Sequence, residues 1–264
     1  MRIFCTDLSN THTRGAVIEN QKIIWQDAVS TKSIEKRIPT WESQLSNLSV
    51  SSVALASVVP LKNDIIYQLA DYKGIPLFHL TSENCPIPLD YPQPSEIGQD
   101  RLANAVAAAY MIQANTIIID LGTATNFDVY HHPKGYAGGI IAPGLALMTE
   151  YLHQKTALLP KLDPQNLDTE EILGKSTLEA LKVGCDYGYA GMIQNLLDRL
   201  LKNAEESDQQ FPSIVATGGY SQWIQKRIRP IPKVIPDLTL QGIYLAAIKQ
   251  IKKEDLNFQD TEEP

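Results

Sequence analysis

Two stretches of the chain carry the same succession of apolar runs and short polar turns. The first covers residues 2–18 and turns directly after Asp7, and the second covers residues 116–130 and turns directly after Asp120. Runs of β-branched and aromatic residues bounded by small polar residues are typical of β-strands. We therefore predict in each stretch a strand that ends at an aspartate, a hydroxyl-rich turn and a second strand.

A second pair of similar segments follows the first in each half of the chain. Residues 50–60 and residues 212–221 are apolar runs that continue into loops of small residues. In each half, a predicted hairpin is thus followed by a later strand with a small-residue end. This order predicts two related α/β lobes with a cleft between them. The alternative is that any two α/β lobes share strands that end in small residues.

Two long segments between these strands have helical patterns. Residues 95–111 are rich in alanine, which is the best helix former. Residues 177–202 carry leucines at helical spacing and three glycines on one helical face, Gly184, Gly188 and Gly191. Glycine costs about 1 kcal/mol at each interior helix position. We therefore expect another helix, from this chain or from a second subunit, to approach this face closely; the alternative is a helix that breaks near Gly184.

The chain length suits two domains, since 264 residues is about twice a small domain of ~100–200 residues. We assign residues 1–114 to an N-terminal α/β lobe and residues 115–253 to a C-terminal α/β lobe. Residues 236–247 are predicted to form a capped closing helix. Residues 254–264 contain five acidic residues and no basic one, which predicts a solvated, disordered tail.

Composition and charge narrow the class of protein. The chain is 44% hydrophobic and 20% charged, as ordinary globular proteins are. The net charge is −7, and no stripe of Lys and Arg is present, which argues against nucleic acid and membrane surfaces as partners. No apolar run reaches the ~18 residues of a membrane span, and the N-terminus has no signal-peptide core. Three cysteines without a Cys-x-x-Cys motif are typical of a reducing compartment, so we expect a cytoplasmic protein.

One short segment resembles part of a nucleotide-binding motif. Residues 174–177 read Gly-Lys-Ser-Thr, as the end of a P-loop does, but the earlier glycine of that motif would fall at Thr169. Glu170 and Glu171 lie between, and their charges would repel phosphate. A P-loop is therefore excluded, and no Gly-x-Gly-x-x-Gly follows a predicted strand to suggest a dinucleotide fold.

The turns after Asp7 and Asp120 are the first candidates for chemistry. Small hydroxyl residues and backbone amides in such turns can bind phosphate oxygens, and a carboxylate at the strand end can hold the accompanying cation. Each turn alone could be an ordinary hairpin. The pair, one in each lobe, indicates a nucleotide bound between the lobes. The loop at residues 216–219 could line the adenosine, or could be a simple tight turn.

The start of the Ala-rich helix is the second candidate. Gly98, Gln99, Asp100 and Arg101 lie in its first turns, where helix amides and the arginine attract anions such as a substrate carboxylate. We expect Asp100 to be ionised, to orient a substrate hydroxyl and to accept its proton late. Phosphoryl transfer accepts so weak a base because its transition state is loose. The alternative is an Asp–Arg pair that lies at the start of a helix and has no role in catalysis or binding.

The order and spacing of these motifs resemble the type III pantothenate kinases, bacterial members of the actin-like ATPase superfamily, over about residues 2–248. The resemblance implies an α/β fold of two RNase H-like lobes, a duplicated actin-like ATPase fold with an inter-lobe cleft. The segments that carry it are Asp7–Arg14, Gly98–Arg101, Asp120–Thr125, Gly138–Gly144, Leu159–Pro160, Gly174–Thr177 and Thr217–Gly219.

The resemblance also implies roles for individual residues. The implied ATP contacts are Asp7, Leu8, Ser9, Asn10, Thr11, His12, Thr13, Arg14 and Thr123. The implied pantothenate contacts are Tyr91, Gly98, Gln99, Asp100, Arg101 and, across a homodimer interface, Thr177. Asp100 takes the place of the catalytic base. Asp7 would lie near the Mg²⁺ that accompanies ATP, and Asp120 would bind a monovalent cation, K⁺ or NH₄⁺.

The implied reaction transfers the γ-phosphoryl group of ATP to the terminal hydroxyl of pantothenate, the first step of coenzyme A synthesis. Two residues depart from the family pattern, because Ser9 stands in place of glycine and Asn126 in place of threonine. A serine would strain the loop if the turn needs a positive φ. The alternatives are a phosphatase of the same superfamily, in which water replaces the alcohol, and a non-catalytic nucleotide-binding regulator.

Overall fold

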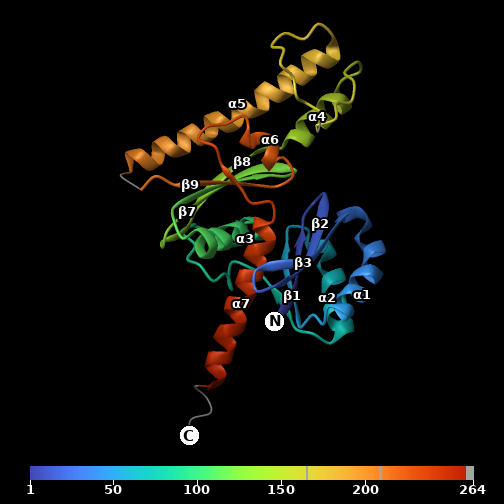
Figure 1. Ribbon diagram of the computed structural model, residues 1–264, viewed down its shortest axis with the longest axis vertical. Coiled ribbons are helices and arrows are strands. Elements are labelled where there is room, and N and C mark those ends of the chain that lie inside the picture. The colour runs from blue at the N-terminus through green and yellow to red at the C-terminus, as the bar shows by residue number, and fades with distance from the viewer. Residues whose placement is uncertain (165, 208–209, 260–264) are drawn as a thin grey trace. The chain divides into compact units, whose positions relative to one another are not determined.

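The structure is a computed structural model that describes residues 1–164, 166–207 and 210–259. The chain divides into two compact units (Figure 1). The first comprises residues 1–113, residues 130–138 and the chain from Asp237 onward, and the second comprises residues 114–129 and 139–236. In the described part of the chain, no helix is both long enough and apolar enough to cross a membrane.

The first unit is built on a five-stranded sheet with the order β3-β2-β1-β4-β5. The strands are β1 Arg2–Leu8, β2 His12–Glu19, β3 Lys22–Ser30, β4 Ser52–Ser57 and β5 Leu77–His79. Strands β1, β2 and β3 pair antiparallel, whereas β4 runs parallel to β1 and β5 runs parallel to β4. The register places Leu8 beside Ser57 and Leu55 beside His79. The carboxyl ends of β1, β4 and β5 therefore share one edge, where open α/β sheets bind ligands.

Helices cover both faces of this sheet (Figure 1). Helices α1 (Ile38–Asn47) and α2 (Asn63–Lys73) pack on one face around an aromatic and aliphatic core. Helices α3 (Gln99–Ala107) and α7 (Leu238–Gln259) pack against each other and against β1 and β4. The core under α1 and α2 includes Phe4, Trp41, Leu45, Val53, Leu55, Ile66 and Leu69. Short 3₁₀ turns lie at Thr31–Arg37, Pro60–Lys62 and Pro94–Glu96, and a π-helical turn lies at Ala108–Ile112.

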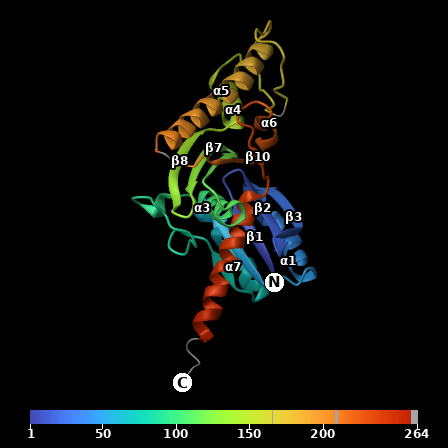
Figure 2. The ribbon, with the colours of Figure 1, turned by 60° about the vertical axis from the view of Figure 1, so that its left-hand side comes forward.

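The second unit repeats the pattern with a sheet of order β10-β9-β6-β7-β8. Its strands are β6 Thr116–Leu121, β7 Ala124–His131, β8 Gly135–Pro143, β9 Ser213–Thr217 and β10 Lys233–Val234. Its helices are α4 Leu145–Lys155, α5 Thr177–Glu206 and α6 Ser221–Gln225. Figure 2 shows α5 lying along this sheet, and their shared core includes Phe127, Leu145, Tyr189 and Ile193. The predicted two-lobe α/β fold is thus confirmed.

The end of the chain packs differently from the prediction. We assigned residues 115–253 to one lobe, yet the chain from Asp237 onward belongs to the first unit. The physical reason is the close fit of α7 against α3, where Gly242 leaves no room for a β-carbon beside the carbonyl oxygen of Ala103. The buried Thr239 hydroxyl also donates to Asn104 Oδ1 at 2.9 Å. Of the predicted disordered tail, the backbone of residues 254–259 continues α7, and residues 260–264 lie outside the described residues.

The two predicted long helices begin and end close to their expected bounds. The Ala-rich helix begins at Gln99 rather than at residue 95, because Pro94–Glu96 form a separate 3₁₀ turn. Helix α5 continues unbroken from Thr177 to Glu206, so the alternative of a break near Gly184 is wrong. Apart from the adjoining residues and backbone of α5 itself, no atom of the described chain lies within 4 Å of a β-carbon added at Gly184, Gly188 or Gly191. The expected close neighbour is therefore not a described part of the same chain.

Candidate active site

Hydrogen bonds from Ser9, within the turn, and from Thr31, outside it, hold the turn after β1. The Ser9 hydroxyl donates to Asp7 Oδ1 at 2.7 Å, and the Thr31 hydroxyl donates to the Ser9 carbonyl oxygen at 2.6 Å. The Thr31 amide donates to the Thr11 carbonyl oxygen at 3.0 Å. Ser9 is not among the residues with positive φ, so the serine adopts this turn without strain. Sequence reasoning missed Thr31, since nothing in its local pattern connects it to a turn twenty residues earlier.

Arg14 lies on β2 directly opposite Asp7 in the register. Its guanidinium forms an ion pair with Asp237, at the residue before α7 begins. Both side chains are about a third exposed, at 29% each. Arg14 therefore joins the sheet to the start of the closing helix, and sequence reasoning missed Asp237 as its partner. The role of Arg14 in phosphate binding stays a prediction.

The start of α3 holds the candidate base. Gly98 is the residue before the helix, and a β-carbon there would lie 2.6 Å from Asp100 Oδ1. Asp100 Oδ1 accepts a hydrogen bond from the Arg101 amide at 2.8 Å. Burial raises the pKa of the Asp100 carboxyl above its ordinary value of 3.8, and the amide and charge of Arg101 oppose this rise. A carboxylate with a raised pKa is a better proton acceptor than an exposed one.

An aromatic cluster brings the other predicted pantothenate residues together. The Arg101 guanidinium carbon lies 5.8 Å from the centre of the Tyr136 ring, and the Tyr91 ring centre lies 6.1 Å from the same ring. Tyr136 is fully buried, and its backbone pairs with Pro88 and Asp90 at 3.0 and 2.9 Å. The structure therefore places Tyr91 and Arg101 around one tyrosine. Sequence reasoning missed Tyr136, because only the fold brings the tip of the β7–β8 hairpin to residues 88–91.

The side chain of Gln99 is hydrogen-bonded to two strand ends at the edge of the sheet. Its Oε1 atom accepts hydrogen bonds from the Ser57 amide at 2.6 Å and from His79 Nε2 at 2.8 Å. These residues end β4 and β5, so Gln99 ties the start of α3 to two neighbouring strand ends. Among the described residues of the first unit, Asp7 and Gln99 thus belong to the same carboxyl edge. A direct contact of Gln99 with pantothenate stays a prediction.

In the second unit, the turn after β6 surrounds Asp120. Asp120 pairs with Thr217 across β6 and β9, and Gly218 follows with a φ of +84°. A β-carbon at Gly218 would lie 2.8 Å from Asp120 Oδ1 and 2.6 Å from the Leu121 carbonyl oxygen. Both oxygen atoms therefore lie close to the Gly218 backbone, which leaves no room for a side chain at this position. Oxygen ligands of this kind suit a hard cation, so these residues fit the cation that the resemblance implies.

Other residues of this unit show what surrounds the turn. Thr123 is exposed, and Gly144 packs so closely that a β-carbon would clash with the carbonyl oxygens of Gly122 and Thr123. The Thr125 hydroxyl and the Tyr189 hydroxyl are hydrogen-bonded at 2.6 Å. Within residues 1–164, 166–207 and 210–253, no three His, Cys, Asp or Glu side chains gather as a metal site. A cation at either turn would therefore need oxygens from the backbone or from substrate as well.

The P-loop-like segment turns out to be a helix cap. The Ser176 hydroxyl accepts a hydrogen bond from the Glu179 amide at 3.2 Å, and Glu179 accepts one from the Lys175 amide at 2.7 Å. Thr177 is the first residue of α5 and its side chain is exposed. Ser176 is thus the N-cap of α5, and the Glu179 carboxylate binds the amide of the residue before it. This cap explains the Gly-Lys-Ser-Thr pattern without a phosphate.

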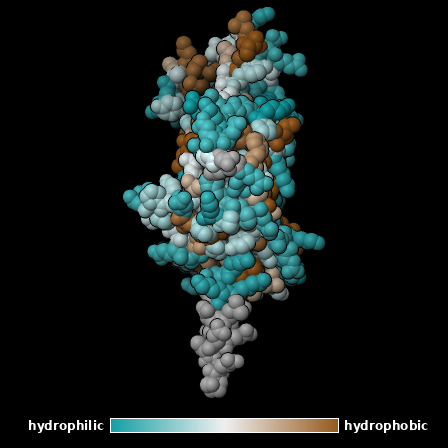
Figure 3. All heavy atoms as spheres, turned by 90° about the vertical axis from the view of Figure 1, so that its left-hand side faces the viewer, coloured by the Kyte–Doolittle hydropathy of each residue, from teal (hydrophilic) through white to brown (hydrophobic). Residues whose placement is uncertain are grey.

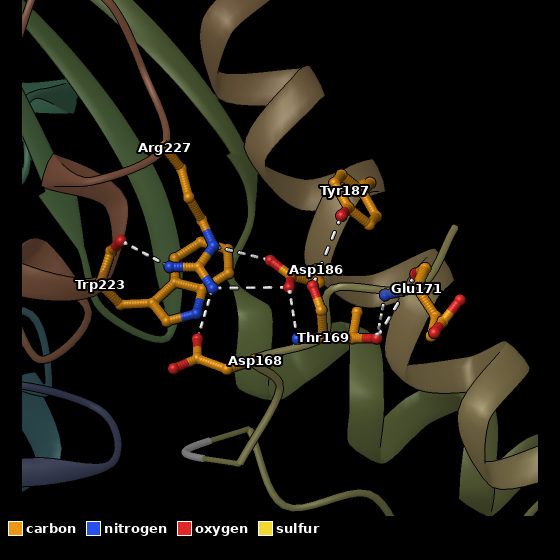
Figure 4. A network of polar contacts seen from close by, with 7 residues as sticks. All are labelled: Asp168, Thr169, Glu171, Asp186, Tyr187, Trp223 and Arg227. Atoms are coloured by element: carbon orange, nitrogen blue, oxygen red, sulfur yellow. Dashed lines mark hydrogen bonds and ion pairs between the residues drawn. The ribbon is translucent and has the colours of Figure 1, made fainter. Parts of the chain in front are cut away.

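A polar network holds the loop that precedes α5 (Figure 4). Arg227 Nε donates to Asp186 Oδ1 at 2.7 Å, and its guanidinium also forms an ion pair with Asp168. The guanidinium carbon lies 4.1 Å from the centre of the Trp223 ring. The Thr169 amide reaches Asp186 Oδ2 at 3.4 Å. Arg227 therefore fastens the loop around residue 168 to both α5 and α6.

The sequence as a whole is similar to known kinases. The sequence model of the type III pantothenate kinase family matches residues 3–199. The chain is 36% identical to the type III pantothenate kinase of Akkermansia muciniphila over 94% of its length and 98% of that protein. It is 35% identical to the type III pantothenate kinase of Legionella pneumophila strain Paris, over 93% of the chain and 98% of that protein.

Solved structures support the fold alone. A Baf family protein from Campylobacter jejuni superposes with a TM-score of 0.59 at 16% identity, covering 96% of this chain and 99% of that one. A ROK hexokinase from Thermus thermophilus superposes with a TM-score of 0.53 at 13% identity, covering 95% and 100%. The predicted actin-like ATPase fold of sugar kinases is thus confirmed. With the family match over most of its length, the chain belongs to the type III pantothenate kinase family.

Proposed function

We propose that the protein transfers the γ-phosphoryl group of ATP to the terminal hydroxyl of pantothenate, giving 4′-phosphopantothenate at the start of coenzyme A synthesis. The names of its relatives support this substrate. The observation that carries the proposal is the buried carboxylate of Asp100 at the first turn of α3, bonded to the Arg101 backbone amide. A carboxylate with a raised pKa beside a fixed cation suits a substrate that carries both an alcohol and a carboxylate.

In this proposal, Asp100 orients the hydroxyl of pantothenate and accepts its proton as the bond to phosphorus forms. The acceptor needs only modest basicity, because a loose phosphoryl-transfer transition state depends more on alignment and charge than on proton removal. Burial raises the pKa of Asp100, which strengthens the carboxylate as a proton acceptor. Arg101 binds the pantothenate carboxylate, and its contact with the Tyr136 ring limits the directions in which its guanidinium can point.

We further propose that both turns take part in ATP binding. Backbone amides and hydroxyls of residues 9–13, with Thr123, bind the phosphates. Asp7 would hold Mg²⁺ together with ATP oxygens, and Asp120 with the Leu121 carbonyl would hold K⁺ or NH₄⁺. When bound, these cations neutralise negative charge on the phosphate chain. The well-ordered hydrogen bonds of Ser9 and Thr31 support a turn that is pre-formed for phosphate.

A homodimer and a cytoplasmic location complete the proposal. Apolar side chains lie exposed on the second unit, and brown spheres gather at the top of the view in Figure 3. Leu158, Ile172 and Leu173 are 91%, 73% and 72% exposed. A second copy of the chain would cover these side chains and approach the glycine face of α5, which brings Thr177 to the partner's pantothenate. The three free cysteines support a reducing compartment.

A coupled assay of ADP release with and without pantothenate tests the proposal. We expect release to depend on pantothenate and to fall when Na⁺ replaces K⁺. Phosphate release at the full rate without pantothenate would favour the phosphatase alternative. Binding of ATP by calorimetry without any turnover would favour the non-catalytic regulator.

A further inference from the structure

A chain of three side chains lies behind the candidate base. The Tyr67 hydroxyl and His79 Nδ1 are 2.8 Å apart, and His79 Nε2 lies 2.8 Å from Gln99 Oε1. Gln99 Oε1 also accepts from the Ser57 amide at 2.6 Å. The chain therefore runs from α2, through the end of β5, to the residue next to Asp100.

The donors and acceptors in this chain have one consistent assignment. The Ser57 amide can only donate, so the Gln99 atom facing it must be the carbonyl oxygen. That oxygen can only accept, and His79 Nε2 must therefore carry a proton. Neutral His79 then accepts from the Tyr67 hydroxyl through Nδ1.

Gln99 is well placed to control the orientation of its neighbours. It is the first residue of α3, and the proposed pantothenate residues Asp100 and Arg101 follow it directly. Its carbonyl oxygen joins two strand ends, β4 at Ser57 and β5 at His79. The loop beyond β5 is itself held, since Asn84 Nδ2 donates to the His79 carbonyl oxygen at 2.8 Å. A rotation of α3 about its axis would have to break both bonds to Gln99.

We infer that His79 is a positioning residue, which acts through Gln99 to hold Asp100 and Arg101 in the orientation that pantothenate phosphorylation needs. The inference deepens the proposed function and rests on it for the identity of the substrate. The turn after β1 is fixed separately by Thr31. Loss of the His79 link should therefore impair the pantothenate side of the reaction and spare ATP binding.

The test compares His79→Leu, His79→Gln and a matched control, Ser51→Ala. Leucine removes the donor, whereas a glutamine amide places an N–H group close to the position of Nε2. Ser51 donates to the Arg2 carbonyl oxygen at 3.0 Å, at the amino-terminal ends of β1 and β4 and therefore at the opposite edge of the sheet. Small misalignments of a catalytic group can cost up to about a hundredfold. We expect His79→Leu to lower kcat/KM for pantothenate by roughly tenfold to a hundredfold with an unchanged KM for ATP, and both other variants to stay within roughly threefold of wild type.

Hydrogen exchange of residues 97–107 provides a readout that does not depend on the substrate. We expect faster exchange at the start of α3 in His79→Leu and not in Ser51→Ala. If wild type fails to phosphorylate pantothenate, the proposed function is wrong, and exchange alone then decides the positioning role. If wild type is active and His79→Leu matches it in kcat/KM, or if its exchange is unchanged, the inference is overturned. An equal rise in the KM for ATP and for pantothenate would indicate general destabilisation and would also overturn it.

Discussion

Replacement of Arg227 by methionine should destabilise the second unit strongly. The side chain of Asp186 is only 5% exposed, and that of Arg227 is 20% exposed. Without Arg227, the carboxylate of Asp186 stays buried and loses its 2.7 Å partner. Removal of one member of a buried ion pair costs about 3–5 kcal/mol, because the remaining charge has lost both water and its partner. Asp168, the other acid on Arg227, is 85% exposed, so Asp168→Asn should cost no more than about 1 kcal/mol.

Urea unfolding measures these differences in the free energy of unfolding, and hydrogen exchange in β9 identifies the unit that opens. We expect Arg227→Met to lose about 3–5 kcal/mol and the double variant Arg227→Met with Asp186→Leu to recover most of it, since paired apolar replacements of buried ions are often neutral. The reasoning is refuted if Arg227→Met stays within about 1 kcal/mol of wild type. It is also refuted if the double variant is no more stable than the single one.

Two further predictions concern the site itself. Gly218→Ala should cost at least about 1–2 kcal/mol in unfolding free energy, because its φ is +84° and the new β-carbon would lie 2.6 Å from the Leu121 carbonyl oxygen. The β-carbon would also lie 2.8 Å from Asp120 Oδ1 and displace it, so the variant should lose stimulation of activity by K⁺. Unchanged stimulation in potassium titrations would contradict the proposed cation site. Arg101→Met should move the acid limb of the kcat/KM profile for pantothenate to higher pH. The active form is the ionised carboxylate of Asp100. Burial raises the pKa of this carboxyl and Arg101 lowers it, so loss of the arginine charge raises the pKa further. An acid limb that stays in place or moves to lower pH would show that Arg101 does not act on Asp100.

The parts of the fold that could be predicted from the sequence are those fixed by local pattern. Strands β1 and β6, which end one residue after Asp7 and Asp120, follow from β-branched runs that stop at small polar turns. Helix α5 follows from its leucine spacing and the cap at Ser176. Such signals depend on neighbours within a few residues, which determine backbone preference directly.

The remaining features depend on contacts between distant segments. Tyr136 meets Tyr91 and Arg101 only because the hairpin of β7 and β8 reaches the chain at residues 88–90. The closing helix was predicted, but its place in the first unit rests on Gly242 against α3, and a single glycine does not reveal its neighbour. Gln99 illustrates the same limit, since its acceptor role is visible only once the ends of β4 and β5 are aligned.

The central claim is that Asp100 accepts the proton of an alcohol during transfer from ATP. The most direct measurement is the rate of 4′-phosphopantothenate formation by Asp100→Asn, followed by mass spectrometry, with ATP and pantothenate binding measured by calorimetry on the same sample. The account predicts a rate lower by about 10²–10⁴-fold, with both substrates still bound at near wild-type affinity. Formation of 4′-phosphopantothenate by this variant at a near wild-type rate would contradict it.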